Sequence, residues 1–568
     1  MSCSHGCGVP CTVRISGNSQ HDLMCNVQIR MVGPALTSLK TFSRSLPNPS
    51  GGPSRGVGIA AAAAAQRSAH DRSDGTLAET LIDGVTQSLA LGLSAVSIAA
   101  DSLARIQRVV APLPAGFPPG PGSEVALNFL RSPLEFIDSL TQQYGSTVGL
   151  KLGGEQVVLT GDLCLSRQVL IDQADVFGKE GTAFFPGSSL AGNGLLVSDG
   201  PIWQRQRQLS NPAFRQRAVE TYAKAMTDST EAMLATQWQH SGRRDVYKDF
   251  NALTLQVTTQ ALFGDDLPAA EGLRVTGAIQ RAFEYFAGRA ALGFIIPEWL
   301  PTPDNLQYRE AVQQLDSAVY SIIDSRSAKL ATAPATGARQ CLLDQLLLSK
   351  DEQGRGMNRR ALRDELMTLL VAGQETSAIL LGWACAFLAQ HPEVQLRAVE
   401  EVQQVAAGAL LPADVNGMRY LQAVVLETLR LRPPAYIVGR CAQRPVQLGA
   451  FSLPAGTTVL VSPWVLHRDS SVWQEPEAFK PERWMPLLET KSYMSEMSGL
   501  GSNGAYVPFG AGPRNCIGTG FAMMEALLVL AAILQRVQLR TVPGEGFPSA
   551  DPRITLRPAK VPLFISAL

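Results

Sequence analysis

The segment Pro508–Gly518, PFGAGPRNCIG, limits what this chain can fold into more than any other. Three glycines surround Cys516, and a sustained apolar run begins near Phe521. Glycine lacks a Cβ, so the segment predicts a tight turn whose backbone can approach a flat ring closely. A cysteine just before a helix meets the positive end of the helix dipole and free amide donors, which favour a thiolate. The alternative, a buried structural cysteine, does not explain the surrounding pattern.

Two further residues of this segment have predicted tasks. Arg514, two residues before Cys516, is spaced to grip an anionic group with two donors, and Phe509 would shield one side of the sulfur. The pattern Phe-x-x-Gly-x-Arg-x-Cys-x-Gly resembles the heme-binding signature of the cytochrome P450 family. The resemblance implies heme b with its iron held by Cys516 and a propionate held by Arg514. The matching residues are Phe509, Gly512, Arg514, Cys516 and Gly518.

A second segment, Ala372–Ser377 (AGQETS), places an acid and an alcohol inside the apolar run 366–381. Glycine and threonine weaken a helix, so their presence here indicates a function. The segment resembles the oxygen-activating element of the P450 family, which implies catalytic roles for Glu375 and Thr376 in oxygen activation and proton relay. The structural alternative is a threonine that bonds back to its own helix.

Glu427 and Arg430 stand three residues apart, so they share one face of the helix predicted at 421–431. They resemble the Glu-x-x-Arg element of the P450 family, and the resemblance adds Arg483 from FKPERW as a third member. An exposed pair of this kind would contribute little, whereas a buried one would support the fold. These three residues are therefore predicted to be structural.

Other cofactor contacts are predicted from looser patterns. Trp203 and Arg207 stand four apart and resemble the P450 element at a heme propionate; a surface aromatic beside a cation is the alternative. Arg440 resembles a further propionate contact. His467 and Arg468 are also family-like, and His467 is as consistent with a local structural role as with heme contact.

The resemblance covers about residues 123–568 and implies a mainly α fold with small β-sheets, in which a helix-rich lobe joins a smaller β-rich lobe. Periodicity predicts strands at 147–152, 156–160 and 457–462, and long helices at 359–390, 421–431 and 521–536. The balance of 49 basic and 49 acidic residues argues against a nucleic-acid partner.

The N-terminal part has a different composition. Residues 1–70 carry six basic residues against the single acid Asp22, which is typical of an organelle transit peptide; a disordered tail is the alternative. Residues 71–122 are predicted to hold an amphipathic segment and a Pro-rich linker. The uncharged stretch 84–100 is too short and polar to span a bilayer, so we predict peripheral membrane contact or packing on the domain and no transmembrane helix. The leader's spaced cysteines could suit zinc on paper: Cys3, Cys7 and Cys11.

These features predict a monooxygenase that inserts one oxygen atom of O2 into a lipophilic substrate. The alternatives are a fatty-acid hydroxylase, a heme-thiolate isomerase or dehydratase acting on a lipid peroxide, and a non-catalytic heme sensor. We find no flavin or iron–sulfur motif, so a separate electron donor is expected, either a ferredoxin or a P450 reductase. Residues 177–214 look similar to plant and algal P450s that hydroxylate carotenoids, which together with the leader favours a plastid and a carotenoid-like terpenoid.

Overall fold

The computed structural model describes residues 112–123, 125–180, 190–264, 277–278, 281–282, 285, 301–332, 341–406, 408–497, 501 and 503–568. All of these fall in the compact unit Ala99–Leu568. The predicted leader, its three cysteines and the uncharged stretch 84–100 lie outside the described residues.

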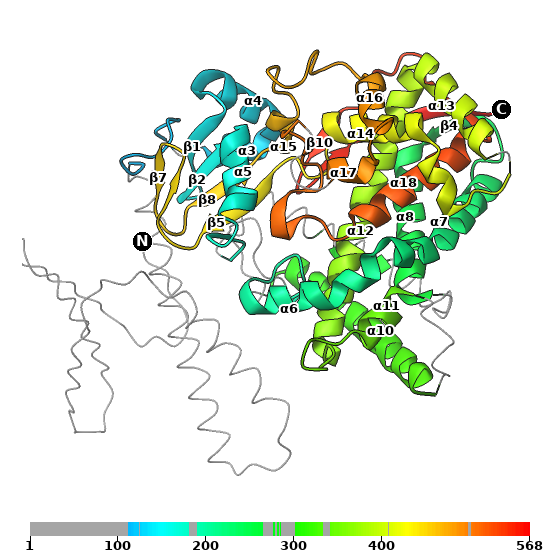
Figure 1. Cartoon of the computed structure of the whole chain (residues 1–568), viewed down its shortest axis with the longest axis horizontal. Helices are drawn as coiled ribbons and strands as arrows, with labels where there is room; N and C mark the ends of the chain where they lie inside the picture. Colours follow the sequence, from blue (N-terminus) through cyan, green and yellow to red (C-terminus); the bar gives the residue numbers. More distant parts are fainter. Residues whose placement is uncertain are drawn as a thin grey trace, which may run out of the picture. The chain divides into compact units, whose positions relative to one another are not determined.

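A five-stranded sheet organises the β-rich part of this unit (Figure 1). The strand order is β1-β2-β8-β5-β3; β2 and β8 run parallel, and the other neighbours are antiparallel. Val157 and Leu159 pack in one apolar cluster with α4, whereas Val158 packs in another with η1, so both faces are covered. The elements are β1 (Thr147–Leu152), β2 (Glu155–Thr160), β3 (Phe177–Gly178), β5 (Val438–Ala442), β8 (Thr458–Val461), α3 (Ala126–Arg131), α4 (Pro133–Tyr144), α5 (Leu163–Arg167), η1 (Gln168–Asp172) and α15 (Pro463–Leu466).

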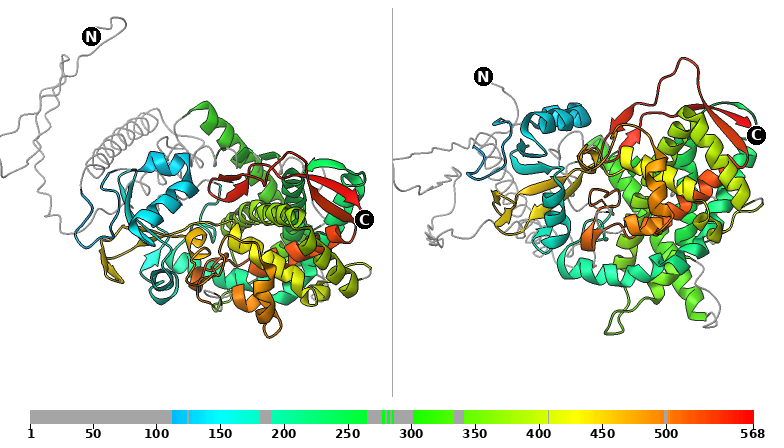
Figure 2. Two further views of the ribbon diagram at one scale, coloured as in Figure 1. Left: turned by 90° about the horizontal axis from the view of Figure 1, so that it is seen from above. Right: turned by 45° about the horizontal axis from the view of Figure 1, so that its top comes forward.

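The larger core lies among helices, apart from the sheet in both views of Figure 2. Helix α18 is predominantly apolar and does not confine its apolar residues to one face, as expected of a helix that is buried all round. The core helices are α7 (Gln216–Thr236), α8 (Val246–Phe263), α12 (Arg359–Gln390), α14 (Arg419–Leu431) and α18 (Thr519–Leu534). Around them lie α6 (Gly200–Ser210), η2 (Asn211–Phe214), α10 (Pro303–Thr332), α11 (Leu342–Leu348), α13 (Pro392–Val405), η4 (Pro412–Asn416), η5 (Pro481–Trp484), α16 (Met485–Leu488), α17 (Tyr493–Met497) and η6 (Gly512–Arg514).

Three smaller sheets complete the described fold. One has the order β4-β12-β9, and the other two are the antiparallel pairs β6–β7 and β10–β11. Their strands are β4 (Gly242–Asp245), β6 (Val446–Leu448), β7 (Phe451–Leu453), β9 (Val537–Thr541), β10 (Ala550–Pro552), β11 (Leu556–Pro558) and β12 (Pro562–Ala567). The predicted mainly α fold with small sheets is confirmed.

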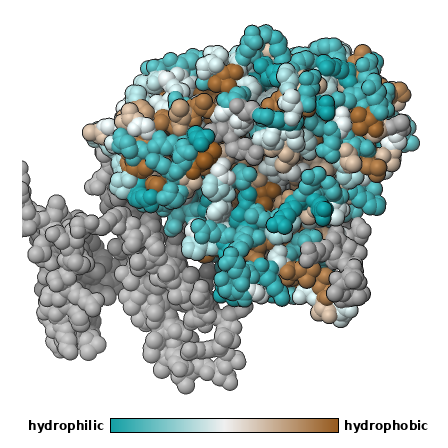
Figure 3. Space-filling model, in the orientation of Figure 1, coloured by the Kyte–Doolittle hydropathy of each residue, from teal (hydrophilic) through white to brown (hydrophobic). Residues whose placement is uncertain are grey.

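Helix α12 is, among the described residues, the one helix long and apolar enough to cross a membrane. Of its most apolar window, 72% is buried inside the protein, so packing in the core accounts for its composition. On the face drawn in Figure 3, most of the described surface is hydrophilic and apolar side chains are scattered over it.

The six predicted strands and helices all form, with ends within two residues of the predicted ones. The Pro-rich linker lies against the sheets: Gly149 donates its amide to Pro119 (2.9 Å), and Ser452 donates to Gly116 (2.9 Å). The division into 1–70, 71–122 and 123–568 stays a prediction.

Candidate active site

The loop that carries Cys516 is a closed turn. The Cys516 amide donates to the Phe509 carbonyl at 2.9 Å, and Gly510 and Gly512 have φ values of +70° and +71°. A Cβ on Gly512 would lie 2.0 Å from the Leu170 carbonyl oxygen, so this glycine lets the loop pack on η1. A Cβ on Gly510 would meet no atom within 4 Å, so there is open space beside the loop at this residue.

The Cys516 side chain is exposed, yet protein atoms crowd around it closely enough to raise its pKa by desolvation. Opposing this, the Gly518 amide, Arg207, the Thr519 hydroxyl and Lys179 lower the pKa, in that order of size. The predicted amide donor near the helix N-terminus does lower the thiol pKa, but in the metal-free protein the cost of desolvation is the larger effect. A bound cation would supply the missing stabilisation.

Four cationic side chains interact electrostatically at this site: Lys179, Arg207, Arg440 and Arg514. Lys179 follows β3, which pairs with β5, the strand of Arg440, so the sheet brings these two together. Burial lowers the pKa of Arg440 to about 10, and its guanidinium donates to the Gly439 carbonyl (2.8 Å). Within the described part of the chain, no carboxylate pairs with Arg440.

Arg514 lies between the thiolate loop and helix α6. It pairs with Asp199, the N-cap residue of α6, and donates to the Ser198 carbonyl at 2.9 Å. Its guanidinium carbon lies 4.2 Å from the centroid of the Trp203 ring. Burial lowers the pKa of Arg514 to about 10. Trp203 thus packs against the guanidinium of Arg514, the residue predicted to hold a propionate. The sequence did not predict this contact.

Arg207 lies in α6, one helical turn after Trp203, and contacts the thiolate loop directly. It donates to the backbone carbonyl of Asn515 (2.7 Å) and to the Asn515 side chain (2.9 Å), next to Cys516 in sequence. Cys516 partly offsets the lowering of the Arg207 pKa by burial. The predicted residues Trp203, Arg207, Arg514 and Cys516 are therefore brought together.

Glu375 and Thr376 lie in the middle of α12. The Thr376 hydroxyl donates to the Ala372 carbonyl (2.7 Å), as in the structural alternative, but Ala372 is exposed although most of this helix is buried. Solvent therefore reaches the face that carries Thr376. The Glu375 carboxylate accepts from Thr555 (3.1 Å) and lies 3.8 Å from Arg557, and burial raises its pKa.

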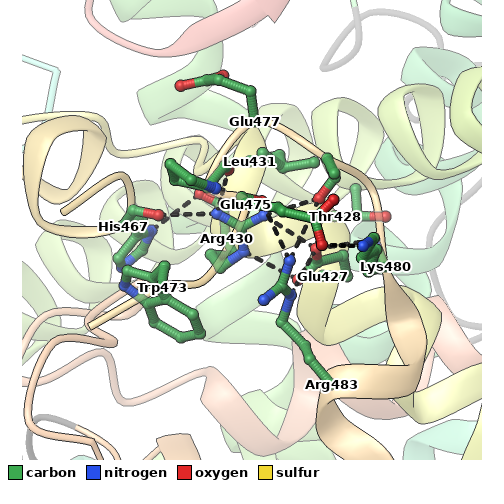
Figure 4. A network of polar contacts seen from close by, with 12 residues as sticks. Glu427, Thr428, Arg430, Leu431, His467, Trp473, Glu475, Glu477, Lys480 and Arg483 are labelled. Atoms are coloured by element: carbon green, nitrogen blue, oxygen red, sulfur yellow. Dashed lines mark hydrogen bonds and ion pairs between the residues drawn. The ribbon is translucent and has the colours of Figure 1, made fainter. Parts of the chain in front are cut away.

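Glu427, Arg430 and Arg483 form the predicted buried network (Figure 4). Arg430 and Glu427 are fully buried and 2.9 Å apart, and Arg483 donates to Glu427 at 3.0 Å. Arg430 also donates to three backbone carbonyls: those of His467, Pro476 and Ala478. The donors of Arg430 are thus used inside the network, as its predicted structural role requires.

His467 joins this network to the thiolate loop. The Val507 amide donates to His467 Nε2 (2.9 Å), so the proton on Nδ1 is donated to the Arg430 carbonyl (3.1 Å). Burial lowers the pKa of His467 to about 3. Of its two proposed roles, the contacts support the structural one. Arg468 likewise bonds to the Leu431 and Trp464 carbonyls.

Residues 114–563 match the family model described as Cytochrome P450. The chain belongs to the cytochrome P450 family. This P450 is 35% identical over 421 residues to cyclooctatin synthase of Streptomyces melanosporofaciens, covering 74% of this chain and 88% of that protein. It is 32% identical to cyclooctat-9-en-7-ol 5-monooxygenase of the same organism (73% and 86% covered), and 30% identical to pentalenene oxygenase of Streptomyces avermitilis (74% and 89% covered).

The fold of this P450 is similar to the crystal structure of the cytochrome P450DA heme domain. The TM-score is 0.69 at 24% sequence identity, and the match covers 81% of this chain and 98% of that one. This likeness supports the fold that the sequence predicted.

The residues around Cys516 suit a heme. Among the described residues, Arg514 pairs with Asp199, whereas Arg207 and Arg440 pair with no carboxylate, so a ligand carrying two carboxylates would balance these two guanidinium groups. The loop that carries the exposed thiol has open space at Gly510. Cys516 would bind the iron, and the cations would hold the propionates.

Sequence reasoning missed Lys179 and Asp199. Lys179 donates its ammonium to the Leu196 carbonyl (2.9 Å), and burial strongly lowers its pKa. Asp199 accepts from the backbone amides of Lys179 and Glu180 as well as from Arg514. Asp199 precedes Gly200-Pro201, a helix-start pattern, but that signal indicates a cap and not a partner for Arg514.

Proposed function

We propose that this P450 is a heme-thiolate monooxygenase that inserts one oxygen atom of O2 into a lipophilic terpenoid. The observation that carries the proposal is the exposed Cys516 thiol close to Arg207 and Arg440, two arginines that pair with no carboxylate in the described part of the chain. Such a site fits a flat dianionic cofactor with a thiolate-bound iron, for which we propose heme b. When bound, the heme with its thiolate ligand supplies oxygen binding and O–O cleavage.

We assign the handling of protons to Glu375 and Thr376 of helix α12. Burial raises the pKa of Glu375, a shift in the direction that suits a proton donor. Thr555 and Arg557 hold the Glu375 carboxyl group in place. The Thr376 hydroxyl gives its own proton to Ala372, so its oxygen stays free to accept a hydrogen bond.

The substrate class rests on the relatives. One is named cyclooctat-9-en-7-ol 5-monooxygenase and another pentalenene oxygenase, both terpenoid names. We propose a terpenoid for this P450 on that basis, with a carotenoid as a narrower option from the similarity of residues 177–214. Part of that segment, 181–189, lies outside the described residues.

The remaining parts of the proposal concern partners and place. We propose that a ferredoxin or a P450 reductase supplies the electrons. The composition of residues 1–70 supports a plastid location, and the stretch 84–100 supports peripheral membrane contact. Expression of a fusion of residues 1–110 to a fluorescent protein in plant cells would test the proposed plastid location.

Difference spectra of the ferric protein test the substrate. Di- and sesquiterpenes, carotenoids and fatty acids are titrated in turn, and a terpenoid is expected to shift the Soret band. Turnover of the same terpenoid under ¹⁸O2 should give a product with one labelled oxygen atom. A shift with fatty acids alone would overturn the substrate class. Conversion of a lipid hydroperoxide without electrons or O2 would instead support an isomerase or dehydratase.

A further inference from the structure

Helix α18, which follows the thiolate loop, carries one fully buried acid among apolar residues. Glu525 is 0% exposed, and its Oε2 accepts a hydrogen bond from the Ser377 hydroxyl at 2.5 Å. Its other oxygen, Oε1, has no hydrogen-bond partner within the described part of the chain. Ser377 is itself buried, in α12. The pair is thus a polar link across a largely apolar interface between α12 and α18.

An acid is a costly residue at this position. Burial raises the pKa of Glu525 to about 8, the hydrogen bond from Ser377 lowers it, and no charged group of the described residues contributes. An apolar side chain of similar volume would avoid the cost of burying a half-satisfied carboxyl group. Packing alone therefore does not explain why an acid occupies position 525. Its hydrogen bond to the residue after Thr376 offers an explanation.

Ser377 immediately follows Thr376, the predicted catalytic alcohol. Gln374, three residues before Ser377, is bonded to helix α8. Thr254 donates to its carbonyl (2.8 Å), and its side chain donates to the Asn251 side chain (3.0 Å). The segment that carries Thr376 is therefore held by hydrogen bonds from two neighbouring helices, and Glu525 supplies the one from α18.

Helix α18 begins at Thr519, three residues after Cys516, and the Thr519 hydroxyl donates to the Cys516 carbonyl at 2.9 Å. Glu525 therefore ties the element that positions the thiol to the element that positions Thr376. A change in this tie would alter the position of Thr376 relative to Cys516.

We propose that the Ser377–Glu525 hydrogen bond fixes the position of Thr376 relative to Cys516, which makes Glu525 a positioning residue for oxygen activation. The inference rests on the proposed function, because it assigns a role within the same reaction. It requires a hydrogen-bond acceptor at position 525 and a donor at position 377.

The test compares S377A, E525L and E525Q with a matched control, S229A. Ser229 is also a buried serine that donates to a side chain on a neighbouring helix, Gln260 of α8 (3.1 Å), but in helices without any predicted catalytic residue. In the heme-loaded enzyme with an electron donor and substrate, peroxide released per electron is expected to rise about fivefold in S377A and E525L, the effect of losing one hydrogen bond. E525Q keeps the acceptor, so it and S229A should resemble the wild type.

Two further readouts separate positioning from general damage. The substrate dissociation constant from the Soret titration and the absorption maximum of the reduced carbon monoxide complex should be unchanged in all four variants, since neither requires Thr376. Serine-to-alanine is the smallest change available, so S377A answers the question even where E525L fails to fold.

Full coupling in S377A would overturn the inference, as would equal peroxide release from E525Q and E525L. Both results are read against a wild type that makes an oxygenated product. A wild type that consumes no O2 with any donor and terpenoid would instead overturn the proposed function, so the two failures are distinguishable.

Discussion

Cys516 shows how far one residue's chemistry depends on its surroundings. Its place before α18 gives it the Gly518 amide and two nearby cations, yet desolvation outweighs these and raises the thiol pKa. The metal-free thiol is thus predicted to be mostly protonated and to lose its proton when iron binds, because a metal ligand must be the thiolate.

We predict that Cys516→Ala abolishes the red-shifted absorption of the reduced carbon monoxide complex, because alanine offers no sulfur to the iron. Cys164→Ala is the matched control, since Cys164 is also exposed but lies on α5 in the sheet region. The measurement is a difference spectrum of each heme-loaded protein. A Cys516→Ala protein with an unchanged spectrum would show that another residue is the ligand.

At the scale of elements, the buried Glu427–Arg430–Arg483 network of α14 and η5 is connected to the thiolate loop through His467. Arg430 bonds to Glu427 and to the backbone before η5, and its own carbonyl accepts from His467, which holds the Val507 amide. Helix α14, the 467–484 segment and the loop after Val507 are therefore one connected structure. A substitution in this network should therefore alter the position of Cys516 although none of the network residues need contact the heme.

We expect Arg430→Met to lower the free energy of unfolding by about 3–5 kcal/mol, because it leaves the fully buried Glu427 without its main partner. The control is Lys224→Met at an exposed i,i+4 pair with Asp228, which should change stability by less than ~1 kcal/mol. Urea denaturation followed by circular dichroism gives both values. Equal effects would show that the network contributes no more than a surface pair.

At the scale of the whole molecule, the fold buries two acids whose pKa values are raised by desolvation. Burial raises the pKa values of Glu365 and Glu525 to about 8, well above the 4.5 of an unfolded chain. Between these values the folded protein keeps protons that the unfolded chain releases, so stability falls as pH rises. His467, whose pKa is lowered to about 3, acts in the opposite direction below pH 6.5. The window above pH 6.5 therefore isolates the acids.

We predict that Glu525→Gln removes about 1.6 kcal/mol of the loss of stability between pH 6.5 and 8, because one proton contributes at most ~1.4 kcal/mol per pH unit and Glu525 is half ionised at its folded pKa of about 8. Thermal unfolding of the wild type and the variant at several pH values in this range gives the two slopes. Parallel slopes would show that Glu525 is already ionised in the folded protein.

Local sequence patterns determined the elements and the main chemical groups. Periodicity was enough for α12, α14 and α18, because helices depend on residues near one another in the chain. The spacing of Phe509, Arg514 and Cys516 likewise predicts a thiolate site from a single short segment. Motif order also supplied Arg483, although 53 residues separate it from Arg430. The substrate did not follow from such patterns.

Only the tertiary structure decided which distant residues complete the site. Lys179 joins Arg440 through the pairing of β3 with β5, Asp199 meets Arg514 across more than 300 residues, and Glu525 meets Ser377 between two buried helices. It also showed that desolvation governs the pKa of Cys516. Charge balance and burial depend on everything that packs around a group, so they are fixed when the chain folds and not by any local run of residues.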